Sequence, residues 1–225
     1  MGVFVSGMEK MMTASAVMHK PIRWGQAGGY LAGAVWLAAC TAGIYWAMSY
    51  DFRPGQLGSA RLQWPSETLL KPAPGKMTVV AFIHPRCVCS KATVNQLIKA
   101  VARHPEVSVI VPVFAPPKPD TEDWEQAEYV KLLKTGLPDA RVIMDQGGLE
   151  AARFQAPTSG VILVYDKQAR EIFRGGITNR RGGEEDNPGL RAFNRTLTTG
   201  RHDAFSAYAR VFGCSLVAPA KTGGG

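Results

Sequence analysis

Hydrophobic positions near the start of the chain form one long uninterrupted run. From Ala27 to Met48 no residue is charged over 22 positions. A helix of that length spans roughly 30 Å, the thickness of the hydrocarbon core of a membrane. We therefore predict a transmembrane helix over residues 26–49, with Trp24 near one interface and Tyr45 and Trp46 near the other. The alternative, a buried helix of a soluble domain, fits less well because such helices rarely lack charge for so long.

From residue 76 onward the pattern changes to short β-branched runs that alternate with helical periodicity. Residues 77–83 and 107–114 predict two buried strands. Between them, apolar residues at helical spacing predict a helix over 88–103. The elements expected next are a helix from Asp120 or Thr121 to about Thr135, a strand at 141–144, a short helix at 149–154, a hairpin of 160–165 and 170–174, and a helix that starts at Asn187-Pro188.

This order, β-α-β-α-β-α-β-β-α, predicts an α/β fold of the thioredoxin-like type, with a central mixed sheet flanked by helices. The sheet would begin with parallel crossovers and end in a hairpin. The domain organisation that we expect is a cytoplasmic N-terminal extension (1–25), the transmembrane helix (26–49), a linker rich in Pro and Gly (50–75), the thioredoxin-like domain (76–216) and a flexible tail (217–225).

Charges beside the apolar run predict its orientation. Three basic residues precede it, whereas one acidic and two basic residues follow it closely: Lys10, Lys20 and Arg23, then Asp51, Arg53 and Arg61. This bias favours a cytoplasmic N-terminus and a C-terminal domain that faces the periplasm. Leu37-Ala38-Ala39-Cys40 also resembles a bacterial lipoprotein processing site, which would leave a lipidated Cys40. Both alternatives tether the domain to the outer face of the membrane.

The chain is basic, with 26 Lys and Arg against 18 Asp and Glu and a net charge of +8. From Tyr50 onward the counts are 23 and 17. The arginines after residue 170 lack the interleaved aromatic residues on which single-stranded nucleic acid stacks. We therefore expect a solvated basic face near anionic lipids and no nucleic-acid partner.

The candidate chemistry lies in His84-Pro85-Arg86-Cys87-Val88-Cys89-Ser90, between the first strand and the following helix. A thiol at a helix N-terminus is stabilised as thiolate by unpaired backbone N–H groups and the helix dipole. Cys87 is therefore the candidate nucleophile. Arg86 can lower its pKa, and His84 can transfer a proton or simply fix the turn.

Two other cysteines are candidates to resolve a mixed disulfide on Cys87. Cys89 is separated from Cys87 by one residue, where common dithiol oxidoreductases have two. A bridge between them would close a small, strained ring that is easily reduced. Cys214 is a third thiol in the same compartment. We expect a protein thiol or disulfide as partner and no cofactor.

Two other interpretations of the cysteines remain open. His84, Cys87 and Cys89, with Cys214 as a fourth ligand, have the donor atoms that Cu(I) or Zn prefers, which would make the domain a metal-binding module. Alternatively, one structural bridge and a buried free cysteine would only stabilise a tethered domain. A glycine-rich stretch at 175–189 is either a substrate-shaping loop beside Cys87 or a plain surface loop.

Several motifs in one order carry a family resemblance. They are His84-Pro-Arg-Cys-Val-Cys-Ser, then Thr158-Ser159-Gly160 before Leu163-Val164-Tyr165-Asp166, then Gly175-Gly176-Ile177-Thr178, and Phe212-Gly213-Cys214. Together they resemble the RedB-type membrane-anchored thioredoxin-like proteins, from the membrane helix to about Leu216. The resemblance implies a thioredoxin-like fold and a redox role.

Within this resemblance we expect five residues to face the substrate: Thr158, Ser159, Gly160, Gly175 and Gly176. The chain departs from thioredoxins at one of them. Gly160 stands where thioredoxins have a cis-proline opposite the reactive cysteine, and Pro157 is too early to replace it. Backbone pairing with a substrate at this edge is therefore expected to differ.

Overall fold

The computed structural model describes residues 24–117 and 124–217. Its first helix, α1 (Trp24–Asp51), is apolar, and from Ala27 onward it is long enough to cross a membrane. The prediction of one N-terminal apolar helix is confirmed, and the helix is a candidate membrane span. A second compact unit begins at Ala47. Predicted features in 1–23 and 218–225, and the caps at Asp120 or Thr121, lie outside the described residues.

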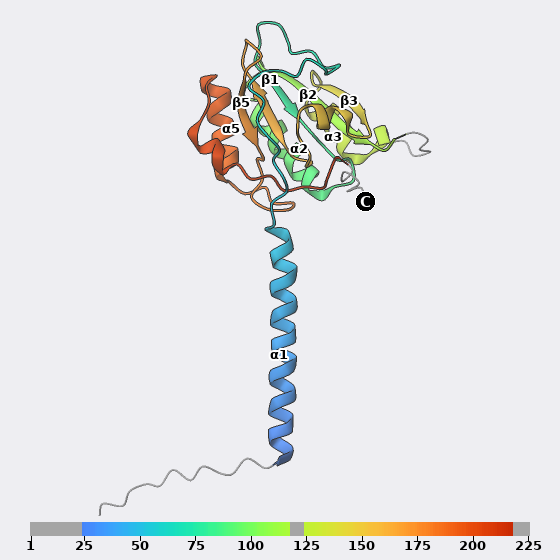
Figure 1. Ribbon diagram of the computed structural model, residues 1–225, viewed down its shortest axis with the longest axis vertical. Helices are drawn as coiled ribbons and strands as arrows, with labels where there is room; N and C mark the ends of the chain where they lie inside the picture. Colours follow the sequence, from blue (N-terminus) through green and yellow to red (C-terminus); the bar gives the residue numbers. More distant parts are fainter. Residues whose placement is uncertain (1–23, 118–123, 218–225) are drawn as a thin grey trace, which may run out of the picture. The chain divides into compact units, whose positions relative to one another are not determined.

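The second unit is built on a five-stranded sheet with the order β3-β2-β1-β4-β5 (Figure 1). The strands are β1 (Thr78–Ala81), β2 (Ser108–Ala115), β3 (Arg141–Gln146), β4 (Ile162–Tyr165) and β5 (Glu171–Gly175). β1, β2 and β3 run parallel, whereas β4 is antiparallel to both β1 and β5. The predicted mixed sheet, with parallel crossovers followed by a hairpin, is confirmed, and the fold is thioredoxin-like.

Three helices cover one face of this sheet. They are α2 (Val88–Val101), α3 (Glu128–Gly136) and α5 (Pro188–Thr199), and their apolar side chains share one core cluster with the strands. Two 3-10 turns, η1 (Trp124–Gln126) and η2 (Ala204–Tyr208), flank them. The predicted start of the last helix is confirmed: the Asn187 side chain accepts a hydrogen bond of 2.9 Å from the backbone N–H of Leu190, and proline follows Asn187.

The opposite face is covered by the short helix α4 (Leu149–Arg153) and by two irregular segments. One is residues 57–70, in which Leu70 is 1% exposed and the Trp64 ring packs edge-on against Phe154 at 5.1 Å. The other is the C-terminal segment, residues 209–217, which contributes Val211 and Leu216 to the same core. The Pro- and Gly-rich stretch before the sheet therefore has irregular backbone but packs firmly on the domain.

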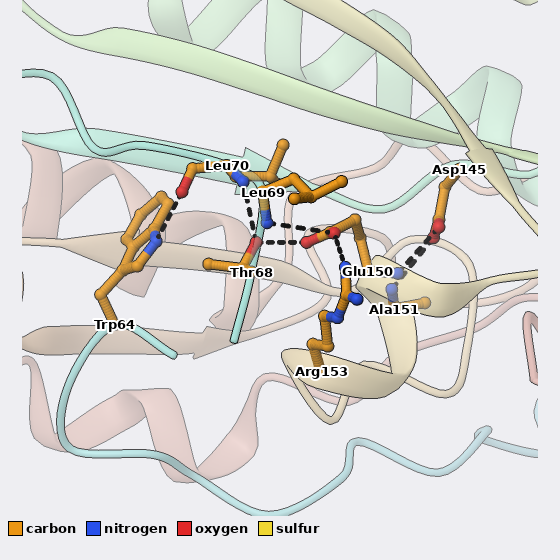
Figure 2. Close-up of polar contacts among 8 residues, drawn as sticks. All are labelled: Trp64, Thr68, Leu69, Leu70, Asp145, Glu150, Ala151 and Arg153. Carbon is orange, nitrogen blue, oxygen red and sulfur yellow. Dashed lines mark hydrogen bonds and ion pairs between the residues drawn. The ribbon is translucent and has the colours of Figure 1, made fainter. Parts of the chain in front are cut away.

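Polar groups hold α4 in place beneath these segments, as Figure 2 shows. The Asp145 carboxylate accepts hydrogen bonds from the backbone N–H groups of Glu150 and Ala151 at 2.8 and 3.0 Å. The buried Glu150 carboxylate in turn binds the Thr68 hydroxyl and pairs with Arg153. Because Gly148 directly before α4 abuts the backbone of Leu216, this network also supports the C-terminal segment.

Candidate active site

Cys87 lies between the end of β1 and the start of α2. Ile83 still bridges to Val113 of β2, and the chain then turns so that Cys87 is the N-cap residue of α2. The turn is closed by a hydrogen bond from the Cys87 N–H to the His84 carbonyl at 3.2 Å, and the Cys87 carbonyl accepts from Ser90 N–H at 2.8 Å. The expected position of this thiol at the helix N-terminus is therefore the observed one.

The C-terminal segment brings Cys214 directly to Cys87. The two Sγ atoms lie 3.0 Å apart although 127 positions separate the residues. An antiparallel bridge between Thr158 and Ser215 sets this register. Ser159 fixes the backbone of Cys214 through two hydrogen bonds. Its N–H donates to the Cys214 carbonyl at 2.8 Å, and its Oγ accepts from the Cys214 N–H at 2.9 Å. A Cys87–Cys214 bridge therefore needs only a small approach of the sulfur atoms.

The pKa values of the three cysteine thiols are shifted in different directions. Hydrogen bonds from the thiols of Cys214 and Cys89 hold the pKa of Cys87 well below its ordinary range; burial opposes this, and the Ser159 hydroxyl adds to it. The pKa values of Cys89 and Cys214 are raised, first because each donates to Cys87 and then because of burial. These directions favour Cys87 as the hydrogen-bond acceptor of the cluster and the other two thiols as its donors.

Arg181 is a site residue that the sequence did not single out. One guanidinium nitrogen lies 3.9 Å from Cys89 Sγ and 3.1 Å from the Gly213 carbonyl oxygen. Its charge opposes the rise in the pKa of Cys89. The only sequence signal was its place in the glycine-rich stretch, which Glu184 fastens to Asn95, Gln96 and Lys99 of α2. This stretch lies next to the thiols, as one of the two interpretations predicted.

His84 and Arg86 make contacts mainly with other side chains and with the turn. His84 Nδ1 accepts the Arg86 N–H at 3.2 Å, and its ring stacks on Phe114 at 5.2 Å. Burial lowers the pKa of His84, an effect that the charge of Cys87 opposes and that of Arg86 reinforces. The Arg86 guanidinium lies over the Trp124 ring, 4.4 Å from its centroid. Fixing the turn is thus the role of His84 that these contacts support.

The metal-binding alternative requires at least three ligand side chains close together in space. In residues 24–117 and 124–217, no group of three or more His, Cys, Asp or Glu side chains is arranged to hold a metal ion. His84 Nδ1 already accepts a backbone N–H, and Cys87 and Cys214 contact each other through sulfur.

The residues expected to face a substrate instead contact the chain's own C-terminal segment. Thr158 and Ser159 pair with Ser215 and Cys214, and the Gly176 N–H donates to the Ala209 carbonyl at 3.0 Å. A Cβ added to Gly175 would lie 2.3 Å from that of Ala209, so this position has no room for a side chain. Their role toward an external substrate stays a prediction.

The backbone of Gly160 explains why glycine and not proline occupies this position. Its φ is +88°, which proline cannot adopt, and its N–H donates to the Phe82 carbonyl at 2.7 Å, a bond that proline cannot make. The segment is thus held by a hydrogen bond to Phe82, the residue directly after β1, and the following Val161 is buried in the core.

Two solved structures with TM-scores of 0.52 and 0.50 support the fold. A hypothetical protein SMc02350 from Sinorhizobium meliloti is 16% identical, with a TM-score of 0.52, and covers 76% of this chain and 99% of its own. An uncharacterized conserved protein from Geobacillus kaustophilus is 17% identical, with a TM-score of 0.50, and covers 75% and 93%. A secreted Mycobacterium tuberculosis disulfide oxidoreductase is 15% identical, with a TM-score of 0.41, and covers 56% and 82%. No protein-family model and no curated protein matches the sequence.

Proposed function

We propose that the protein is a thiol-disulfide oxidoreductase that is tethered to the membrane by α1 and works in the periplasm. The observation that carries the proposal is the thiol cluster: Cys87 caps α2, and its Sγ lies 3.0 Å from that of Cys214. Donors that favour the thiolate surround Cys87. A low-pKa thiolate in contact with a second thiol is the arrangement that disulfide exchange requires.

The proposed cycle moves two electrons between the cluster and a protein partner. Oxidation joins Cys87 and Cys214 in an internal disulfide, and the two electrons and two protons reduce a partner disulfide to a dithiol. The reverse reaction oxidises a partner dithiol. Cys89 is the third thiol, and it can attack the Cys87 sulfur to release Cys214, with Arg181 stabilising the thiolate that attacks.

The tether and its orientation rest on the apolar helix and on the charges beside it. α1 is long enough to span a membrane, and the basic residues before it favour a cytoplasmic N-terminus. Labelling of intact cells with a membrane-impermeant maleimide tests this directly. The cells are first treated with a membrane-impermeant phosphine, which opens the proposed Cys87–Cys214 bridge. Modification of the exposed Cys214 without lysis is then the expected result, whereas labelling only after lysis contradicts a periplasmic domain.

Thiol exchange is tested on the full chain in detergent, equilibrated with glutathione redox buffers, with bridges mapped by mass spectrometry. We expect one internal disulfide that involves Cys87, and we expect Cys87→Ser to abolish exchange. Cys40→Ser is the matched control, because Cys40 lies in α1 and its loss leaves the cluster intact. A Cys87 that stays inert near neutral pH in the folded protein would falsify the proposed function.

A further inference from the structure

The three thiols differ sharply in how solvent can reach them. Cys87 is 4% exposed and Cys89 is 1% exposed, whereas Cys214 is an exposed residue. Disulfide exchange proceeds by attack of a thiolate along the axis of the bond that breaks, so the sulfur that is attacked has to be accessible to the partner. A protein partner meets Cys214 first, and Cys87 lies behind it.

Cys214 is held at this position rather than carried on a loose tail. Both backbone polar groups of Cys214 bind Ser159, and the neighbouring Phe212 and Leu216 are 4% and 2% exposed. Gly213 packs so closely that an added Cβ would lie 1.9 Å from the Ser159 carbonyl oxygen. Moving the segment aside would break these bonds and expose its apolar anchors, so a partner encounters Cys214 in place.

The backbone of residues 157–160 is already paired with the C-terminal segment. Leu216 donates to the Pro157 carbonyl at 2.8 Å, Thr158 bridges to Ser215, and Ser159 pairs with Cys214. A partner peptide that tried to add to this edge as a strand would find the position filled by the chain's own C-terminal segment. Recognition at the exposed residue Cys214 needs no such displacement.

We propose that Cys214 is the partner-facing thiol and that Cys87 is the internal thiol behind it, an inference that rests on the proposed function. In the oxidised protein, a thiolate of a partner dithiol attacks the Cys214 sulfur. The partner–Cys214 disulfide forms, the Cys87–Cys214 bond breaks, and the electron pair leaves on Cys87 as thiolate. The partner's second thiol then attacks its own bonded sulfur, so the partner becomes a disulfide and Cys214 leaves as a thiol.

The chemistry of the leaving group agrees with this order. Thiol-disulfide exchange is faster when the departing sulfur has a low pKa. In this step Cys214 is bonded to sulfur and donates no hydrogen bond, whereas the hydrogen bonds that Cys87 accepts from Cys89 and Ser159 remain and favour its departure as a thiolate. Read in reverse, the same step has the Cys87 thiolate attack a mixed disulfide on Cys214. This differs from the order expected from the sequence, in which Cys87 attacked the partner and Cys89 or Cys214 resolved the mixed disulfide.

The test uses the full-length chain in detergent, oxidised with diamide to form the Cys87–Cys214 bridge, with Cys89→Ser to prevent internal reshuffling. Reduced glutathione is added briefly, the reaction is quenched with acid, and the thiol set free is alkylated with N-ethylmaleimide. We expect glutathione on Cys214 and maleimide on Cys87. If Cys89→Ser alters the far-UV circular dichroism, the wild-type chain replaces it in the same assay.

Glutathione mainly on Cys87 overturns the inference and leaves the proposed function intact, because exchange still occurs. Failure of the bridge to form, or a bridge that glutathione cannot open in the folded chain, overturns the proposed function together with the inference. A further variant sharpens the result. Phe212→Ala removes an anchor beside Cys214 and is expected to shift glutathione toward Cys87 as the segment loosens. An unchanged distribution in this variant also counts against the inference, because its order depends on a fixed segment.

Discussion

Replacing Gly160 with proline, the residue that thioredoxins have at this position, is expected to destabilise the domain strongly. The Gly160 backbone has a φ of +88°, far from the value that proline imposes. Proline also removes the hydrogen bond of 2.7 Å to Phe82 and leaves a buried carbonyl without its donor, which costs about 1 to 3 kcal/mol. With the added strain of moving the backbone out of the left-handed region, the free energy of unfolding should fall by about 3 to 5 kcal/mol.

Gly160→Ala is the matched control for this substitution. Alanine keeps the N–H and loses only the freedom to adopt a positive φ, at a cost of about 1 to 2 kcal/mol. Its Cβ would lie 3.1 Å from Thr93 Oγ1, a contact that a small shift relieves. Urea unfolding of the full chain in detergent measures both effects. Trp64 is a suitable fluorescent reporter because it packs against Phe154 and Tyr165 in the core.

The two variants differ in whether the hydrogen bond to Phe82 can form. If Gly160→Pro is as stable as Gly160→Ala, the hydrogen bond to Phe82 does not hold this segment and the absence of proline has another cause. The same samples also report on the site. Because Ser159 precedes Gly160 and binds both backbone groups of Cys214, the proline variant should form less of the Cys87–Cys214 disulfide than the alanine variant.

Two further predictions concern the electrostatics of the cluster. The Cys87 thiolate should persist in its ultraviolet absorbance from about pH 8 to about pH 5, because its lowered pKa keeps it charged where an ordinary thiol with a pKa of about 8.5 is protonated. This signal should vanish in Cys87→Ser, and loss of absorbance near the ordinary thiol pKa in the wild type would contradict the assigned donors. In a Cys87→Ser background, Arg181→Gln should raise the pH at which Cys89 becomes alkylated, whereas Arg181→Lys should keep part of the effect. Equal pH profiles for all three chains would show that Arg181 does not act on Cys89.

The sequence by itself predicted the strands and helices of the domain and their order. Of the helix expected from Asp120 or Thr121, the described part begins with a 3-10 turn at Trp124–Gln126, and α3 begins only at Glu128. Apolar periodicity reports which side of a strand or helix is buried, so the alternation of strands and helices, the terminal hairpin and the apolar α1 all followed from local pattern. The start of α5 at Asn187 and the place of Cys87 at the start of α2 followed in the same way, because a cap depends on neighbouring residues.

Only the tertiary structure decided how the thiols are arranged. No local pattern relates Cys87 to Cys214 across 127 positions, or Arg181 to Cys89 across 92. The first contact depends on how the C-terminal segment packs on one face of the sheet, and the second depends on how the glycine-rich stretch lies beside α2. The same packing buries Cys87 and leaves Cys214 exposed. Exposure depends on which distant segments cover a residue, and the residues next to Cys87 in the sequence do not show which segments those are.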